Sequence, residues 1–123
     1  MGLIACVDSD VLIDYFDGIQ AAGDELSRYE GLLISRIVWM ELLAGAPAEG
    51  PRKMRESFLR QFPIVELDER VAREAVALRL KHRVKLPDAI IWATARINQA
   101  LLVTRNAKDF PRRDPEIRIP YQV

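Results

Sequence analysis

A run of five apolar residues that ends abruptly in three oxygen-bearing side chains constrains the fold more than any other feature of this sequence. Leu3-Ile4-Ala5-Cys6-Val7 contains no polar position, which is typical of a central strand buried on both faces. Asp8-Ser9-Asp10 follow directly, and short side chains of this kind favour a helix start. The two signals together predict a strand that leads straight into a helix, which Gly18 ends.

The same alternation continues along the chain. Further strands are expected at 32–34, 64–66, 101–103 and, as a possible edge strand, 117–119. Further helices are expected at 20–30, 35–45, 52–61, 68–82 and 87–97, with Ser35 as a cap and Pro87 in a first helical position. Strands that alternate with helices predict an α/β fold with a mainly parallel sheet of four to five strands, covered on both faces.

Composition excludes several classes of protein. The length of 123 residues predicts a single domain over 1–123. Eighteen basic and 18 acidic residues cancel, which excludes an overall electrostatic attraction to nucleic acid but not a local basic patch. The one cysteine cannot form an intrachain disulfide, and no segment has the composition of a membrane helix or a secretory signal. We therefore expect a cytoplasmic protein without membrane contact.

Three acidic residues stand out by their expected positions. Asp8 falls at the carboxyl end of the first strand, where open parallel sheets bind ligands; it is less needed as a helix cap, since Ser9 and Asp10 are also suited to capping. Glu41 interrupts a helix that is apolar on most of its circumference, so we interpret the helix as largely buried, which favours a cation over a narrow stripe facing water. Asp88 lies in a first helical turn, where the helix dipole alone explains an acid.

Asp109 follows the strand at 101–103 and a short loop, so it is expected near the same sheet edge as Asp8 unless it is a simple turn residue. Two carboxylates 5 Å apart repel by roughly 3 kcal/mol at an effective dielectric of 20. A cluster of them therefore has to be protonated or to bind a cation, and oxygen ligands select Mg²⁺ or Mn²⁺. One histidine and one cysteine cannot make a zinc site.

Carboxylate-bound metal ions activate water for phosphodiester cleavage, a reaction that also needs a basic rim facing the phosphates. Each candidate for that rim is equally explained as a solvated surface charge. The candidates are Arg36, Arg105 and Lys108, with Arg112 and Arg113 nearby in sequence.

Four segments resemble the PIN-domain ribonucleases, specifically the VapC-type toxins of prokaryotic toxin–antitoxin pairs. They read VDSDVLID from Val7, SRIVWMELLAG from Ser35, LPDAIIWATA from Leu86 and LVTRNAKDF from Leu102. The resemblance covers essentially the whole chain. Each motif is short, but four in this order at this spacing form a specific match.

The resemblance implies a three-layer α/β/α fold and a metal-dependent endoribonuclease. Its catalytic and metal-binding acids carry over to Asp8, Glu41, Asp88 and Asp109. Asn106 is the alternative to Asp109 in the fourth position, and Ser9 and Thr104 match positions that arrange the site. It also implies a homodimer and a cognate antitoxin that places a segment into or across the acidic groove. Single-stranded or looped RNA is the expected substrate.

Two other functions remain open. Asp8-Ser9-Asp10 also resembles the opening of haloacid-dehalogenase-type phosphatases, in which Asp8 would be a nucleophile; trapping an adduct on Asp8 would support that function. The second alternative is a non-catalytic protein-binding module, although such a module has no need of mutually repelling acids. Metal-dependent cleavage of RNA by the purified chain separates these functions.

Overall fold

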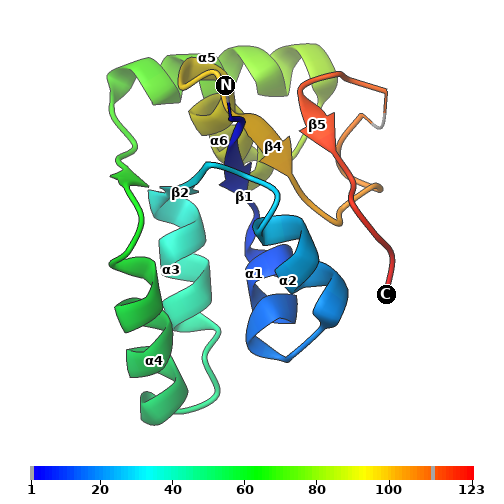
Figure 1. Cartoon of the computed structure of the whole chain (residues 1–123). Helices are drawn as coiled ribbons and strands as arrows, with labels where there is room; N and C mark the ends of the chain where they lie inside the picture. The colour runs from blue at the N-terminus through cyan, green and yellow to red at the C-terminus, as the bar shows by residue number, and fades with distance from the viewer. Residues whose placement is uncertain (1, 112) are drawn as a thin grey trace.

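The computed structural model describes residues 2–111 and 113–123, which form a five-stranded sheet in the order β3-β2-β1-β4-β5 (Figure 1). All four strand pairings are parallel. The strands are β1 (Ile4–Val7), β2 (Gly31–Ser35), β3 (Ile64–Val65), β4 (Leu101–Val103) and β5 (Ile117–Arg118). The prediction of a parallel sheet with four to five strands is confirmed.

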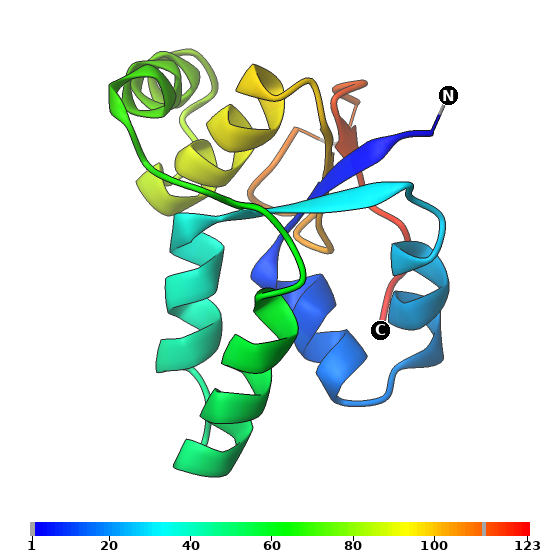
Figure 2. The same ribbon diagram turned by 60° about the vertical axis from the view of Figure 1, so that its left-hand side comes forward.

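Helices cover the sheet on both faces, which gives three layers. In Figures 1 and 2, α5 and α6 lie on one side of the sheet, and the other four helices lie on the opposite side. The helices are α1 (Ser9–Phe16), α2 (Gln20–Leu26), α3 (Arg36–Ala44), α4 (Glu49–Leu59), α5 (Glu69–His82) and α6 (Leu86–Ile97). In the part of the chain that the structure describes, none of these helices has the length and apolar composition needed to cross a membrane.

Several element ends differ from the prediction by one to four residues. Helix α2 stops at Leu26 rather than at residue 30, because the next backbone hydrogen bonds span three residues instead of four, as from Arg28 N to Glu25 O. Helix α4 starts at Glu49, three residues early. Helix α6 starts at Leu86, so Pro87 occupies its second position rather than its first; a missing N–H costs nothing there either, since the first four are unbonded within a helix.

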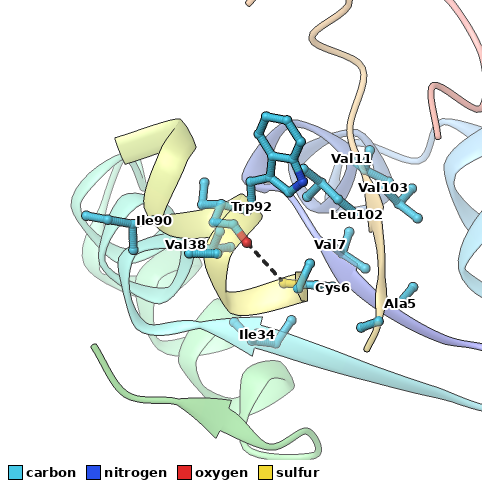
Figure 3. Packing of buried hydrophobic residues seen from close by; sticks show 14 of the residues in the cluster. Ala5, Cys6, Val7, Val11, Ile34, Val38, Ile90, Trp92, Leu102 and Val103 are labelled. Atoms are coloured by element: carbon cyan, nitrogen blue, oxygen red, sulfur yellow. Dashed lines mark hydrogen bonds between the residues drawn. The ribbon is translucent and has the colours of Figure 1, made fainter. Parts of the chain in front are cut away.

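The core confirms that β1 is a central strand. Ala5, Cys6 and Val7 are fully buried, and the Cys6 sulfur faces the backbone oxygen of Ile91 in α6 at 3.9 Å (Figure 3). Trp92 is also fully buried, and its indole N–H donates to Glu116 Oε1 at 3.0 Å. Because both faces of β1 are covered, polar side chains next to this strand have to lie at its ends, and Asp8 lies at the carboxyl end.

The chain order creates a crevice at that end. From β1 the chain moves outward on one side to β2 and then β3, and it returns to place β4 on the other side of β1. Connections therefore leave β1 and β4 in opposite directions, which is the kind of switch point where open α/β sheets bind ligands. Asp8 and Thr104 directly follow these two strands.

Truncation of Leu102 tests this account of the core. Leu102 in β4 is fully buried, so Leu102→Ala is expected to lower the free energy of unfolding by about 2–5 kcal/mol. Leu80→Ala is the matched control, because Leu80 is 78% exposed and its truncation should change stability by no more than about 0.5 kcal/mol. Urea denaturation measures both, and equal losses would contradict the assigned core.

Candidate active site

Asp8 is held in place by both strands at the switch point. Its backbone N–H donates to Val103 O at 2.9 Å. Its Oδ1 accepts from Ser9 N at 2.7 Å, which makes Asp8 the N-cap of α1, and its Oδ2 accepts from the Thr104 hydroxyl at 2.8 Å. The expectation that Ser9 or Asp10 caps this helix in place of Asp8 is wrong. Asp8 itself is the cap, and it also lies at the candidate site. The residue is only 6% exposed, so its charge sits largely out of water.

Glu41 reaches the same edge from α3. Ser35 caps this helix as predicted, accepting from Ile37 N at 3.3 Å. The interpretation of α3 as largely buried is wrong: its neighbours cover only one side, and Met40 and Glu41 are exposed. The Glu41 carboxyl nevertheless turns toward Asp8, since the Ser9 hydroxyl lies 3.3 Å from Glu41 Oε1 and 3.4 Å from Asp8 Oδ1. Ser9 therefore stands between two of the predicted acids.

Asp109 is fixed by the loop that follows β4. Asn106 donates from Nδ2 to Asp109 Oδ2 at 2.9 Å, and Asp109 N donates back to Asn106 Oδ1 at 3.1 Å. Asn106 N in turn donates to the Thr104 hydroxyl at 3.0 Å. Thr104, Asn106 and Asp109 thus form one hydrogen-bonded loop that ends on Asp8.

Electrostatics connects the four acids. Burial raises the pKa of Asp8, although hydrogen bonds from Thr104 and Ser9 oppose the shift. Partial burial of its carboxyl raises the pKa of Glu41, and the charges of Asp8 and Asp88 raise it further. Burial, Asp8 and Asp109 raise the pKa of Asp88 to about 6. Glu41 and Asp88 thus respond to the charge of Asp8 and, respectively, to that of Asp88 and of Asp109. Such shifts are expected where acids lie close together.

Two further residues at this edge escaped the sequence analysis. Burial and then Asp8 raise the pKa of Asp10 to about 7, and within the described residues its buried Oδ1 has no hydrogen-bond partner. Lys85 Nζ lies 3.9 Å from Asp109 Oδ2, and its charge lowers the pKa of Asp88. Both positions carry only weak signals in the sequence, since Asp10 lies two residues after Asp8 and Lys85 lies three residues before Asp88.

The predicted basic rim is mostly engaged elsewhere. Arg36 forms a bidentate pair with Glu66 at 2.9 and 2.5 Å, and its guanidinium lies over the Trp39 ring. Arg105 forms hydrogen bonds of 2.5 and 3.3 Å with Asp14. Lys108 and Arg113 are exposed, and Arg112 lies outside the described residues. Of the three cations named for RNA contact, Lys108 is the one with its side chain toward solvent.

The donor chemistry of the cluster fits a hard divalent cation, because every donor is an oxygen and the acids repel one another. The side chains converge without closing on one point: within residues 2–111 and 113–123, no three Asp, Glu, His or Cys side chains are grouped tightly enough to hold a metal ion. A shared ion therefore needs some of these side chains to move closer together than they stand.

Comparisons with known proteins identify the family of the chain. The PIN domain family model matches residues 5–114. Ribonuclease VapC10 of Mycobacterium tuberculosis is 32% identical over 124 residues, which cover 95% of this chain and 92% of the relative. A toxin–antitoxin complex from Klebsiella pneumoniae contains a chain with a TM-score of 0.90 and 38% identity, covering 97% of this chain and 99% of that one. DNA-bound VapBC from Salmonella typhimurium shares the fold, with a TM-score of 0.72, 22% identity and coverage of 94% and 96%.

The raised pKa of Asp88 predicts that the metal-free protein loses stability as the pH rises from about 4 to about 6. In that window the unfolded chain has released the Asp88 proton while the folded chain keeps it, so the free energy of unfolding falls as pH rises. Asp88→Asn removes this contribution. After allowance for solvent screening, the variant should gain about 1 kcal/mol on wild type between about pH 4 and about pH 7.5.

Urea unfolding in EDTA at the two pH values measures this gain. Asp17→Asn is the control, because Asp17 is an exposed aspartate at the other end of α1. A difference between Asp88→Asn and wild type that does not change with pH would show that Asp88 is not in a cluster of acids.

Proposed function

We propose that this chain, which belongs to the PIN domain family, is an endoribonuclease dependent on Mg²⁺ or Mn²⁺ and the toxin of a toxin–antitoxin pair. A ribonuclease at 32% identity and a toxin–antitoxin complex at 38% identity support the class of activity. The observation that carries the proposal is the position of the buried Asp8, whose Oδ1 lies 3.4 Å from the same Ser9 hydroxyl that lies 3.3 Å from Glu41 Oε1. The charges of the acids agree with this geometry. Asp8 raises the pKa of both Glu41 and Asp88, and Asp109 raises that of Asp88.

In this proposal Asp8, Glu41, Asp88 and Asp109 hold the metal. A bound divalent ion supplies an activated water and stabilises the charge that develops on the phosphodiester oxygens. The chain's own residues orient the acids: the Ser9 amide and the Thr104 hydroxyl fix the two oxygens of Asp8. Asn106 holds Asp109 through its side-chain amide. Such fixed positions reduce the motion needed to reach the reacting geometry.

The predicted partners are part of the same proposal. An antitoxin is the expected protein partner, because the 38%-identical solved chain is part of a toxin–antitoxin complex. RNA is the expected substrate, because the curated relative is a ribonuclease. The homodimer that the family resemblance implies stays a prediction, as does the RNA contact of Lys108.

The two alternative functions are less well supported. Membership of the PIN domain family removes the basis for a haloacid-dehalogenase-like phosphatase. A non-catalytic binding module gives no reason for a buried Asp8 beside other acids, since their repulsion destabilises the fold. Activity measurements with variants of the acids separate this module from the nuclease.

Neutralising any of three acids is expected to abolish RNA cleavage. Asp8→Asn, Glu41→Gln and Asp88→Asn each remove a negative ligand without a large change of volume, so kcat should fall at least about a hundredfold while the fold is retained. Cleavage of a fluorescent single-stranded RNA, with Mg²⁺, with Mn²⁺ and with EDTA, measures the loss. EDTA should stop the wild type, and either ion should restore it.

Exposed acids provide the matched controls for these variants. Asp17→Asn and Glu49→Gln change the same functional groups at exposed positions outside the site, and both should cleave like the wild type. If folded Asp8→Asn and Glu41→Gln cleave as fast as these controls, the proposed metal site is wrong. Cleavage that continues in EDTA would contradict the metal dependence.

Lys108 provides a test of the RNA contact. Because Lys108 is exposed within the loop that carries Asp109, Lys108→Ala should raise KM about two- to tenfold with little change in kcat and make KM less sensitive to salt. Lys53→Ala is the control, since Lys53 is an exposed lysine of α4. A fall in kcat with unchanged KM would contradict an RNA contact at Lys108.

A further inference from the structure

Arg105 points away from the acidic cluster although its two neighbours point into it. Thr104 donates to Asp8 Oδ2 at 2.8 Å, and Asn106 holds the Asp109 carboxylate at 2.9 Å. The Arg105 guanidinium instead donates to both oxygens of Asp14, at 2.5 and 3.3 Å. The segment 104–106 therefore carries two residues of the site and, between them, an arginine whose side chain is bound to α1.

Both members of the Arg105–Asp14 ion pair make further hydrogen bonds. Asp14 is 7% exposed, so hydrogen bonds from its partners have to replace those that water would make to its carboxylate. The Tyr121 hydroxyl, from the segment after β5, donates to Asp14 Oδ2 at 2.8 Å. The Arg105 backbone N–H donates to Asp10 Oδ2 at 3.1 Å. Asp10 and Asp14 lie one helical turn apart on α1, so both the backbone and the side chain of Arg105 are tied to the same helix.

We propose that Arg105 is a positioning residue: its ion pair with Asp14, completed by the Tyr121 hydroxyl, fixes the 104–109 loop so that Thr104, Asn106 and Asp109 stay at the acidic cluster. This inference rests on the proposed nuclease function for its effect on activity, but the loop geometry is measurable without it. It replaces RNA contact as the role of Arg105, because a guanidinium held by a buried carboxylate is not free to bind phosphate.

The chain contains a second triad of a buried carboxylate, an arginine and a tyrosine, with Glu25 in place of an aspartate, and it serves as a control. Glu25 is 4% exposed, and Arg118 donates to its two oxygens at 2.7 and 2.9 Å. The Tyr29 hydroxyl contacts the same carboxylate. The arginine side chains of the two triads are 31% and 33% exposed. The triads are similar in burial and hydrogen bonding, although Arg28 Nε also lies 3.8 Å from Glu25 Oε1. The Arg118 side chain holds α2 to β5, and Arg118 meets the site only through its backbone oxygen, which accepts from Thr104 N at 3.1 Å and is unaffected by a side-chain substitution.

Amide hydrogen exchange in the metal-free protein tests the anchoring directly. Arg105→Gln should speed exchange of the Asn106 and Asp109 amides about tenfold or more, because these amides are protected by the loop that the ion pair holds. Arg118→Gln should leave both amides as in the wild type. Tyr121→Phe removes a single hydrogen bond and should produce a smaller increase than Arg105→Gln, whereas Tyr29→Phe should produce none.

Kinetics and metal affinity then separate positioning from RNA contact. In Arg105→Gln, kcat should fall about ten- to hundredfold with KM nearly unchanged, and the dissociation constant for Mn²⁺ should rise. Arg105→Lys keeps the charge but loses the bidentate pairing, so it should recover only part of kcat. In Arg118→Gln, kcat, KM and the dissociation constant for Mn²⁺ should each stay within about twofold of the wild-type value.

Three results would overturn the inference. Unchanged exchange at Asn106 and Asp109 in Arg105→Gln would show that the ion pair does not hold the loop. A rise in KM alone would make Arg105 an RNA contact. Equal losses of kcat in Arg105→Gln and Arg118→Gln would show that both triads contribute only to the general stability of the fold. If the wild type itself fails to cleave RNA, the proposed function fails, but the exchange and Mn²⁺ measurements still decide whether Arg105 anchors the loop.

Discussion

The charge of Asp8 is held at a place that water barely reaches, and the rest of the site is arranged around that constraint. Asp8 is 6% exposed, and its charge adds to the effect of burial in raising the pKa of Glu41, of Asp88 and of the Cys6 thiol. Hydrogen bonds to Ser9 and Thr104 offset only part of the cost of burial. A fold that keeps repelling acids together gains by neutralising them with a cation, which links stability and proposed activity.

The sheet topology explains how acids so far apart in sequence meet. Strand β1 is central, and the chain fills one side of it before it crosses to the other. The carboxyl ends of β1 and β4 therefore lie side by side, with Asp8 after one and Thr104 after the other. Helices α3 and α6 contact each other and the central strands, and they bring Glu41 and Asp88 to the same edge. At this edge the Ser9 hydroxyl contacts the Glu41 carboxylate, and Asn106 holds the carboxylate of Asp109 three residues further along the loop.

Local features of the sequence predicted much of this arrangement. The apolar run before Asp8 and the capping serine before α3 are signals that act within a few residues, and both were correctly interpreted. The burial of α3 was not predictable, since apolar spacing describes a helix surface but not which neighbours cover it. Ion pairs were equally out of reach: Arg105 meets Asp14 across 91 positions of sequence. An arginine that faces solvent and an arginine that pairs with a buried carboxylate look alike in sequence, so the role of Arg105 was not predictable without the structure.

Anomalous diffraction from crystals of the wild-type protein grown with Mn²⁺ tests the central claim most directly, because it locates the ion without reference to activity. The account predicts a manganese peak within coordination distance of carboxylate oxygens of Asp8, Glu41 and Asp88, with the latter two side chains moved toward Asp8. A peak elsewhere, or density in which no ion touches Asp8 and Glu41 keeps its contact with the Ser9 hydroxyl, would contradict it.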